Sequence, residues 1–106
     1  MEAREIIIIL DCYLKHNWTD VMTAVAKKDF EAMEEPNIIV SEIEKYRILN
    51  EGYRILTLLD PEYPDKIKVV MKPPFVIYYK GNLDTVLERF TDPKYKYIPD
   101  KGCFLD

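Results

Sequence analysis

The densest apolar runs of the chain lie between residues 54 and 83. The first, residues 54–59, contains Ile55, Leu56, Leu58 and Leu59 and is followed by Asp60-Pro61, and the second, residues 75–79, consists of β-branched and aromatic residues throughout. Short runs of this composition between turn signals are typical of strands. We therefore predict a short sheet built from segments 54–59 and 75–80.

Prolines and glycines divide this stretch into elements. Pro64 favours one or two helical turns over residues 65–70, because a missing amide costs nothing at the first helical position. Pro73-Pro74 forces extended backbone before the second strand, and Gly81-Asn82 tolerates the positive φ that ends it.

Upstream, apolar positions with a helical period predict helices over residues 2–16, 18–28 and 37–51. Four consecutive isoleucines, residues 6–9, predict that the first helix is buried on more than one side or packs on a partner. Asn17 is the expected cap of the second helix. Residues 29–35 form a short acidic turn that Pro36 is expected to break.

The third helix has two distinguishable faces. Ile39, Ile43 and Tyr46, followed by Leu49 or Asn50, are expected to face the core. The charged side chains are expected to face water; they are Glu42, Glu44, Lys45 and Arg47.

Downstream, residues 83–90 have apolar positions at helical spacing, and the alternation in the 94–106 tail predicts a last edge strand. The expected architecture is a small single α+β domain, with N-terminal helices packed on a two- to three-stranded sheet. Within the single domain 1–106, residues 1–52 are the helical part, 53–83 the strand and turn segment, and 84–106 the closing helix and tail.

The strand and turn segment resembles the DNA-processing protein A family (DprA, also called Smf). The residues that carry the resemblance stand here as LTLLD, Tyr63-Pro64, Ile67-Lys68, Pro73-Pro74, FVIYY and Lys80-Gly81-Asn82-Leu83. The resemblance extends over residues 42–83 and, more loosely, over the helices before them.

The resemblance implies a scaffold without a DNA site. In that family the segment joins a small helical domain to a Rossmann-like domain, which binds single-stranded DNA and helps load recombinase during natural transformation. The family continues into a strand that ends in a DNA-contacting Gly-Ser/Thr-Arg turn. Here 25 residues follow Gly81, and Gly102, the only later glycine, has no arginine after it. The match is therefore to an N-terminal portion that lacks the Rossmann-like DNA-binding body.

Net charge disfavours a general nucleic-acid binder. The formal charge is −4 over 106 residues, distributed as −6 in residues 1–62, +3 in residues 63–82 and −1 in residues 83–106. Nucleic-acid affinity usually comes from phosphate neutralisation by a basic surface, and here the helical half is acidic.

The sequence shows no signal peptide, so we expect a cytoplasmic protein. Cys12 and Cys103 are therefore expected to be reduced thiols. Cys12 and His16, four residues apart, form either a nucleophile pair or a buried thiol beside an unrelated histidine. The spacing of these residues predicts no metal or cofactor site, and we expect a protein that is not an enzyme.

Two sets of surface residues are candidate sites. The lysines contact DNA or another anion, or simply keep the surface soluble; they are Lys66, Lys68, Lys72, Lys80, Lys94 and Lys96. The tyrosines form a partner interface, or pack inward; they are Tyr78, Tyr79, Tyr95 and Tyr97.

These features lead to two functional hypotheses. The first is a non-catalytic DprA-like module that binds a protein partner, as a phage or mobile-element product modulating a host DNA-processing or defence protein. The alternative is an accessory single-stranded-DNA-binding protein in DNA uptake or recombination. A homo-oligomeric scaffold is a third possibility, and no membrane partner is expected.

Overall fold

A single mixed sheet lies at the centre of the computed structural model, which describes all 106 residues. Its strands are β1 (Arg54–Thr57), β2 (Val76–Tyr79) and β3 (Cys103–Leu105), in the order β1-β2-β3. β2 is antiparallel to β1 and parallel to β3. Together with the helices around it, this sheet confirms the predicted α+β class.

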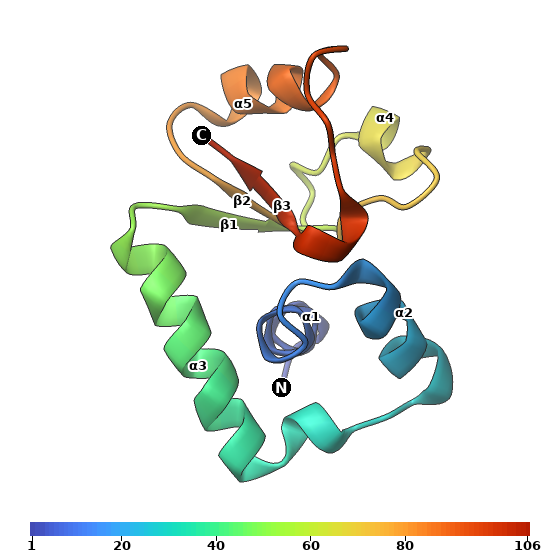
Figure 1. Ribbon diagram of the computed structural model, residues 1–106, viewed down its shortest axis with the longest axis vertical. Coiled ribbons are helices and arrows are strands. Elements are labelled where there is room, and N and C mark those ends of the chain that lie inside the picture. The colour runs from blue at the N-terminus through green and yellow to red at the C-terminus, as the bar shows by residue number, and fades with distance from the viewer.

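The helices form two layers, one on each side of the sheet (Figure 1). α1 (Ala3–Tyr13), α2 (Trp18–Lys27) and α3 (Glu35–Asn50) make the larger layer, and α4 (Asp65–Lys68) and α5 (Leu83–Phe90) the smaller one. Two 3-10 turns complete the chain, η1 (Glu31–Met33) and η2 (Pro99–Lys101). No helix combines the length and apolar character that crossing a bilayer would demand.

Helix starts follow local chemistry. The Asn17 side chain accepts a hydrogen bond from the Asp20 amide at 2.9 Å, and the Asn82 side chain caps α5 in the same way. Pro36 does not break the chain as expected. It lies in the first turn of α3, where a proline lacks only an amide that would be unpaired anyway, so α3 begins before it rather than after it.

Side chains of the sheet alternate between the two layers with a period of two. Val76 and Tyr78 of β2 pack with Ile8, Cys12 and Ile48 of α1 and α3. Ile77 of β2 packs instead in the core on the opposite face of the sheet. The buried members of this core come from all three strands, from α4 and α5 and from the loop before α4; they are Leu56, Tyr63, Ile67, Ile77, Val86, Leu87, Cys103 and Leu105. β2 is thus buried on both faces.

The outer edge of β1 is blocked by side chains. Asp60 accepts from the Thr57 amide at 2.8 Å, and its own amide donates to the Thr57 carbonyl at 3.0 Å. Arg4 of α1 donates to Asp60 at 2.9 Å and to the Ile55 carbonyl at 3.2 Å. These bonds occupy backbone groups that would otherwise be free to pair with another strand.

The tail folds back onto the sheet, but less of it is strand than its alternation predicts. Only Cys103–Leu105 form β3, which pairs with β2 after a crossover through α5. Tyr95 and Tyr97 precede the strand, and their ring centroids lie 5.8 Å and 5.3 Å from that of Phe90. Their alternation therefore reflects packing against α5 and not strand pairing.

Gly102 fixes the close approach of the tail to the helical layer. Its φ is +83°, and a Cβ there would lie 2.6 Å from the Cβ of His16. Gly81 has a similar φ of +90°, but a Cβ at that position would meet nothing within 4 Å. A substitution at Gly81 would therefore cause backbone strain alone, whereas a substitution at Gly102 would cause backbone strain and a steric clash.

We predict that Gly102→Ala destabilises the protein more than Gly81→Ala. Gly81→Ala should cost about 1–2 kcal/mol through its positive φ alone, whereas Gly102→Ala adds a clash and should cost about 3 kcal/mol or more. Urea unfolding followed by the fluorescence of Trp18, the single tryptophan, measures both. Equal losses would contradict the close contact with His16.

Candidate functional site

The C-terminal end of α1 turns sharply and brings His16 into the core. The His16 amide donates to the Asp11 carbonyl at 2.7 Å and the Lys15 amide to the Cys12 carbonyl at 3.4 Å, which is the Schellman pattern. Lys15 and His16 have φ values of +56° and +64°. A left-handed conformation costs a residue other than glycine on the order of 1 kcal/mol. α1 therefore ends at Tyr13, earlier than predicted, and His16 belongs to the turn.

The imidazole of His16 lies between two carboxylates. Its Nδ1 is 2.5 Å from Asp11 Oδ2, its Nε2 is 2.8 Å from Glu44 Oε2, and the residue is 6% exposed. The Tyr78 hydroxyl of β2 donates to the same Asp11 oxygen at 2.5 Å. Both ring nitrogens face acceptors, so the imidazolium satisfies them best. We call Asp11, His16, Glu44 and Tyr78 the His16 cluster.

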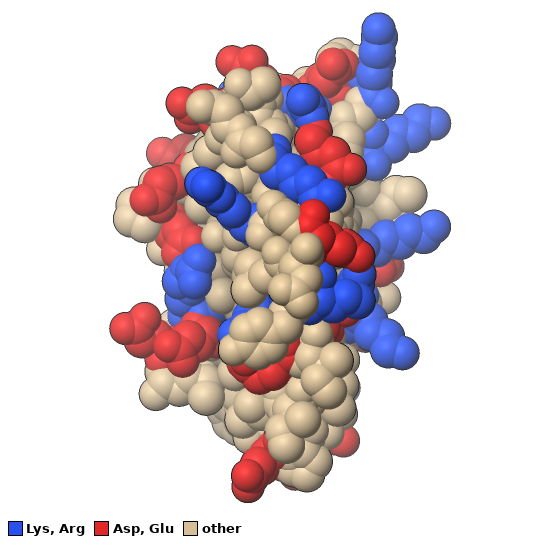
Figure 2. All heavy atoms as spheres, turned by 90° about the vertical axis from the view of Figure 1, so that its left-hand side faces the viewer, with Lys and Arg blue, Asp and Glu red and all other residues tan.

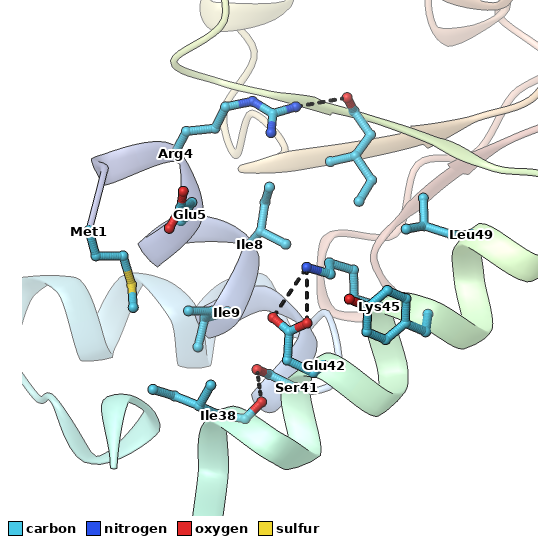
Figure 3. A pocket seen from close by; sticks show the side chains of 12 residues that line it. Met1, Arg4, Glu5, Ile8, Ile9, Ile38, Ser41, Glu42, Lys45 and Leu49 are labelled. Carbon is cyan, nitrogen blue, oxygen red and sulfur yellow. Dashed lines mark hydrogen bonds and ion pairs between the residues drawn. The ribbon is translucent and has the colours of Figure 1, made fainter. Parts of the chain in front are cut away.

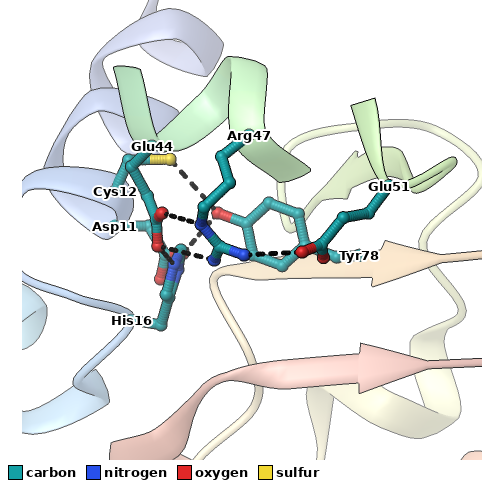
Figure 4. Close-up of polar contacts among 7 residues, drawn as sticks. All are labelled: Asp11, Cys12, His16, Glu44, Arg47, Glu51 and Tyr78. Carbon is teal, nitrogen blue, oxygen red and sulfur yellow. Dashed lines mark hydrogen bonds and ion pairs between the residues drawn. The ribbon is translucent and has the colours of Figure 1, made fainter. Parts of the chain in front are cut away.

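Arg47 anchors the outer end of this cluster (Figure 4). Its Nε donates to Glu44 Oε1 at 2.6 Å, and its Nη1 donates to Glu51 at 2.9 Å. Glu44 is thus held from both sides, by His16 inside and by Arg47 at the surface. The network links α1, α3 and β2 into one unit.

The pKa values follow these contacts. Burial alone would lower the pKa of His16, but the hydrogen bonds and charges of Asp11 and Glu44 outweigh it and raise that pKa above 6.5. Arg47, and then His16, hold the pKa of Glu44 below its ordinary value. Burial raises the pKa of Tyr78 well above 10. The cluster is therefore most stable as an imidazolium between carboxylates, with the tyrosine neutral.

The surroundings of the His16 cluster indicate a structural joint. Cys12 lies 3.6 Å from the Tyr78 hydroxyl, and burial raises the pKa of its thiol to about 12, far from the range of a reactive thiolate. The cavity beside Asp11, His16 and Cys103 measures about 10 Å³, room for no more than one water molecule. Of the two alternatives for Cys12, a nucleophile paired with His16 or a buried thiol, the structure therefore favours the buried thiol.

The His16 cluster also sets the rotation of α3, and the predicted inner face of that helix is wrong. Glu44 points inward to His16, so Ser41 and Ile48, on the same side, are buried at 2% and 0% exposure. Ile43 and Tyr46, expected in the core, are 66% and 56% exposed. The partly buried ion pair between His16 and Glu44 has overridden the apolar periodicity.

This rotation leaves an apolar strip on the outside of α3. The strip, which we call the α3 face, consists of Ile39, Val40, Ile43 and Tyr46, each more than half exposed. Figure 2 looks onto this side of the molecule: around the start of α3, in the lower part of the view, uncharged atoms lie among a few acidic groups, and basic side chains lie higher. Exposed apolar side chains gathered on one helix often mark an interaction site.

A groove between α1 and α3 continues the α3 face (Figure 3). Its volume is about 330 Å³, and Ile8, Ile9 and Ile38 line it together with Tyr46. The ion pair between Glu42 and Lys45, 3.2 Å long, lies at its rim. Lys45, predicted to be fully solvated, is half-buried there.

The candidate lysines are spread over the surface. Lys72 lies before β2, 5.5 Å from the ring of Trp18, and Lys80 follows β2, 4.4 Å from the ring of Tyr53. These two lysines therefore flank opposite ends of the strand. The remaining four are exposed on α4 or between α5 and η2; they are Lys66, Lys68, Lys94 and Lys96.

The candidate tyrosines lie largely within the protein. Tyr78 has 0% exposure and so offers no surface to a partner, which corrects the expectation for this residue. Tyr79, Tyr95 and Tyr97 are half-buried against the core between the sheet and α5. Burial also raises the pKa values of Tyr95 and Tyr97 above 10. These three side chains therefore offer only part of their surface to a ligand.

Comparison with known proteins finds one partial relative. Over 48 residues the chain is 38% identical to Protein Smf of Borreliella burgdorferi (strain ATCC 35210 / DSM 4680 / CIP 102532 / B31). The matched stretch is 45% of this chain and 15% of Smf. No family model and no solved structure matches. A part of the chain is thus similar to Smf, which supports a link to the DNA-processing family that the sequence resembles.

We predict that stability declines as pH rises above 6.5 because of His16. A raised folded pKa contributes stability that is complete below the unfolded value of 6.5 and is lost as pH rises through the folded value. Glu44, with its lowered pKa, contributes stability that is complete above 4.5 and is lost as pH falls through its folded value. The free energy of unfolding, measured by urea titration, should therefore be highest between pH 4.5 and pH 6.5.

The matched variant is His16→Gln. At pH 6 it should be less stable than the wild type by about 3 kcal/mol, because Asp11 and Glu44 lose their shared cation. Above pH 6.5 its stability should stay nearly constant while that of the wild type falls. Parallel pH profiles for the two proteins would show that His16 is not an imidazolium in the folded state.

Proposed function

We propose that this chain is a non-catalytic protein-interaction module, related to part of Smf, that binds a protein partner through the α3 face. The outward position of Ile39, Ile43 and Tyr46 is the observation that carries this proposal. A rigid helix presenting apolar side chains suits recognition of another helix or an apolar surface. Tyrosine is enriched at such interfaces, which agrees with Tyr46 in the strip.

The rigidity of α3 supports this proposal. Ile48 is fully buried against α1 and β2, and Glu44 is fixed by His16 and Arg47. The α3 face therefore keeps its shape without a partner, and binding needs little ordering of the backbone. The resemblance to the DNA-processing protein A family and the identity to Smf favour a partner that takes part in DNA processing. A partner in defence stays a prediction from the sequence.

An accessory role in single-stranded DNA binding receives less support. Phosphate tracking needs cations along one path and bases need open aromatic faces, whereas Lys72 and Lys80 flank opposite ends of β2, and Tyr95 and Tyr97 are half-buried. An origin in a phage or mobile element stays a prediction from the sequence. It would change the source of the partner and not the surface that binds it.

We predict that Ile43→Glu abolishes partner capture. A charged side chain at the centre of the α3 face would have to be desolvated in any apolar interface. Tagged wild-type and variant proteins, mixed with a bacterial lysate and compared by quantitative mass spectrometry, measure the change. A partner bound through the α3 face should fall by at least tenfold in the Ile43→Glu sample.

Val69→Glu is the matched control, because Val69 is 82% exposed and lies outside α3. The control should capture the partner as the wild type does. Capture that survives Ile43→Glu would overturn the proposal. Salt-sensitive binding of labelled single-stranded DNA that weakens in Lys66→Gln or Lys72→Gln would favour the DNA-binding alternative instead.

A further inference from the structure

We propose that the α3 face pairs with the α3 face of a second copy of this chain, with the two helices parallel. This inference rests on the proposed function of the same surface and names one partner for it. It depends on three observations: the spacing of the apolar residues, the charges beside them and the position of α3 at the edge of the molecule.

The exposed residues of α3 follow the spacing of a two-stranded coiled coil. Ile39, Ile43 and Tyr46 are separated by four and then three residues, and Pro36 and Asn50 continue the series at each end. In heptad terms Pro36, Ile43 and Asn50 occupy a positions, and Ile39 and Tyr46 occupy d positions. All five lie on the solvent side of the helix. A polar Asn at an a position is a known device for fixing register in dimers.

The charges beside this strip favour the parallel orientation. Glu35, Glu42 and Leu49 occupy the g positions on one flank, and Val40 and Arg47 occupy the e positions on the other. In a parallel pair each Glu42 faces Arg47 of the second copy, because g and e positions of opposite helices meet five residues apart. In an antiparallel pair g meets g, so Glu42 would face Glu35, Glu42 or Leu49 of the second copy and gain no opposite charge. Charge complementarity therefore selects parallel pairing.

The place of α3 in the fold allows this approach. Figure 1 shows α3 as the outer edge of the helical layer, with α1 on its inner side and the sheet beyond its C-terminal end. Two copies facing each other through α3 would keep their remaining elements on opposite sides. The side chains of Arg47 and Glu42 are 53% and 35% exposed. Within one copy Arg47 is paired with Glu44 and Glu51, and Glu42 is paired with Lys45, so a contact between copies would extend these ion pairs.

The pairing is expected to be weak. Four apolar side chains per copy make a strip smaller than the surface of a stable obligate dimer. Sedimentation velocity from low-micromolar to near-millimolar protein should therefore show a monomer–dimer equilibrium for the wild type. Ile43→Glu should remain monomeric throughout, and Val69→Glu should match the wild type. Circular dichroism checks that each variant is folded.

Glu42→Lys tests the orientation. In the parallel pair the new lysine faces Arg47 of the second copy, so the dimer dissociation constant should rise by several-fold, with an intermediate value for Glu42→Gln. In an antiparallel pair, where Glu42 faces carboxylates of the second copy, Glu42→Gln would remove a repulsion between like charges and tighten the dimer. A dimer tightened by Glu42→Gln would overturn the parallel arrangement.

Two further outcomes separate this inference from the proposed function. A wild-type protein that stays monomeric up to near-millimolar concentration overturns self-pairing, while loss of partner capture in Ile43→Glu would still support the α3 face as a binding surface. A dimer that is unchanged by Ile43→Glu overturns self-pairing through α3 and places the contact on another surface.

Discussion

The charge-assisted hydrogen bonds of His16 with Asp11 and Glu44 join the two main helices, α1 and α3. Asp11 comes from α1, Glu44 from α3, and Tyr78 of β2 adds a third bond to the same centre. Two residues at the end of α1, Lys15 and His16, have left-handed backbone conformations that place the imidazole. Where the tail passes His16, position 102 is a glycine, and a larger residue there would collide with His16. One buried cation therefore links α1 to α3, and the bond between Tyr78 and Asp11 attaches β2 to the same cluster.

The same cation explains why the protein carries an apolar surface. Burying charges is costly, and a buried ion pair seldom adds much net stability, but removing one member leaves the others unpaired. Glu44 must face inward, which fixes the rotation of α3 and sends Ile39 and Ile43 outward. In a protein selected only for stability these isoleucines would be better buried. Their exposure is consistent with a surface kept for binding.

Local patterns in the sequence were sufficient for the elements but not for the face of α3. The strands around Leu56 and Ile77, the cap at Asn17 and the α+β class follow from composition and turn chemistry. The helical period placed Ile43 in the core because it weighs apolar residues alone. The competing term, a long-range bond between His16 and Glu44, has no local signature, since 28 residues separate the two. The parallel pairing of β3 with β2 also has no local signature, because it depends on how the chain crosses over through α5 between the two strands.

The rotation of α3 is tested most directly by cysteine accessibility. Cys12 and Cys103 are buried, and burial raises the pKa of each thiol to about 12, so the wild type should react slowly with a thiol reagent. In the native protein, at concentrations too low for pairing, Ile43→Cys should be labelled rapidly and Ser41→Cys should be protected. Rapid labelling of Ser41→Cys with protection of Ile43→Cys would contradict the account, because α3 would then bury its apolar side and His16 would lose Glu44.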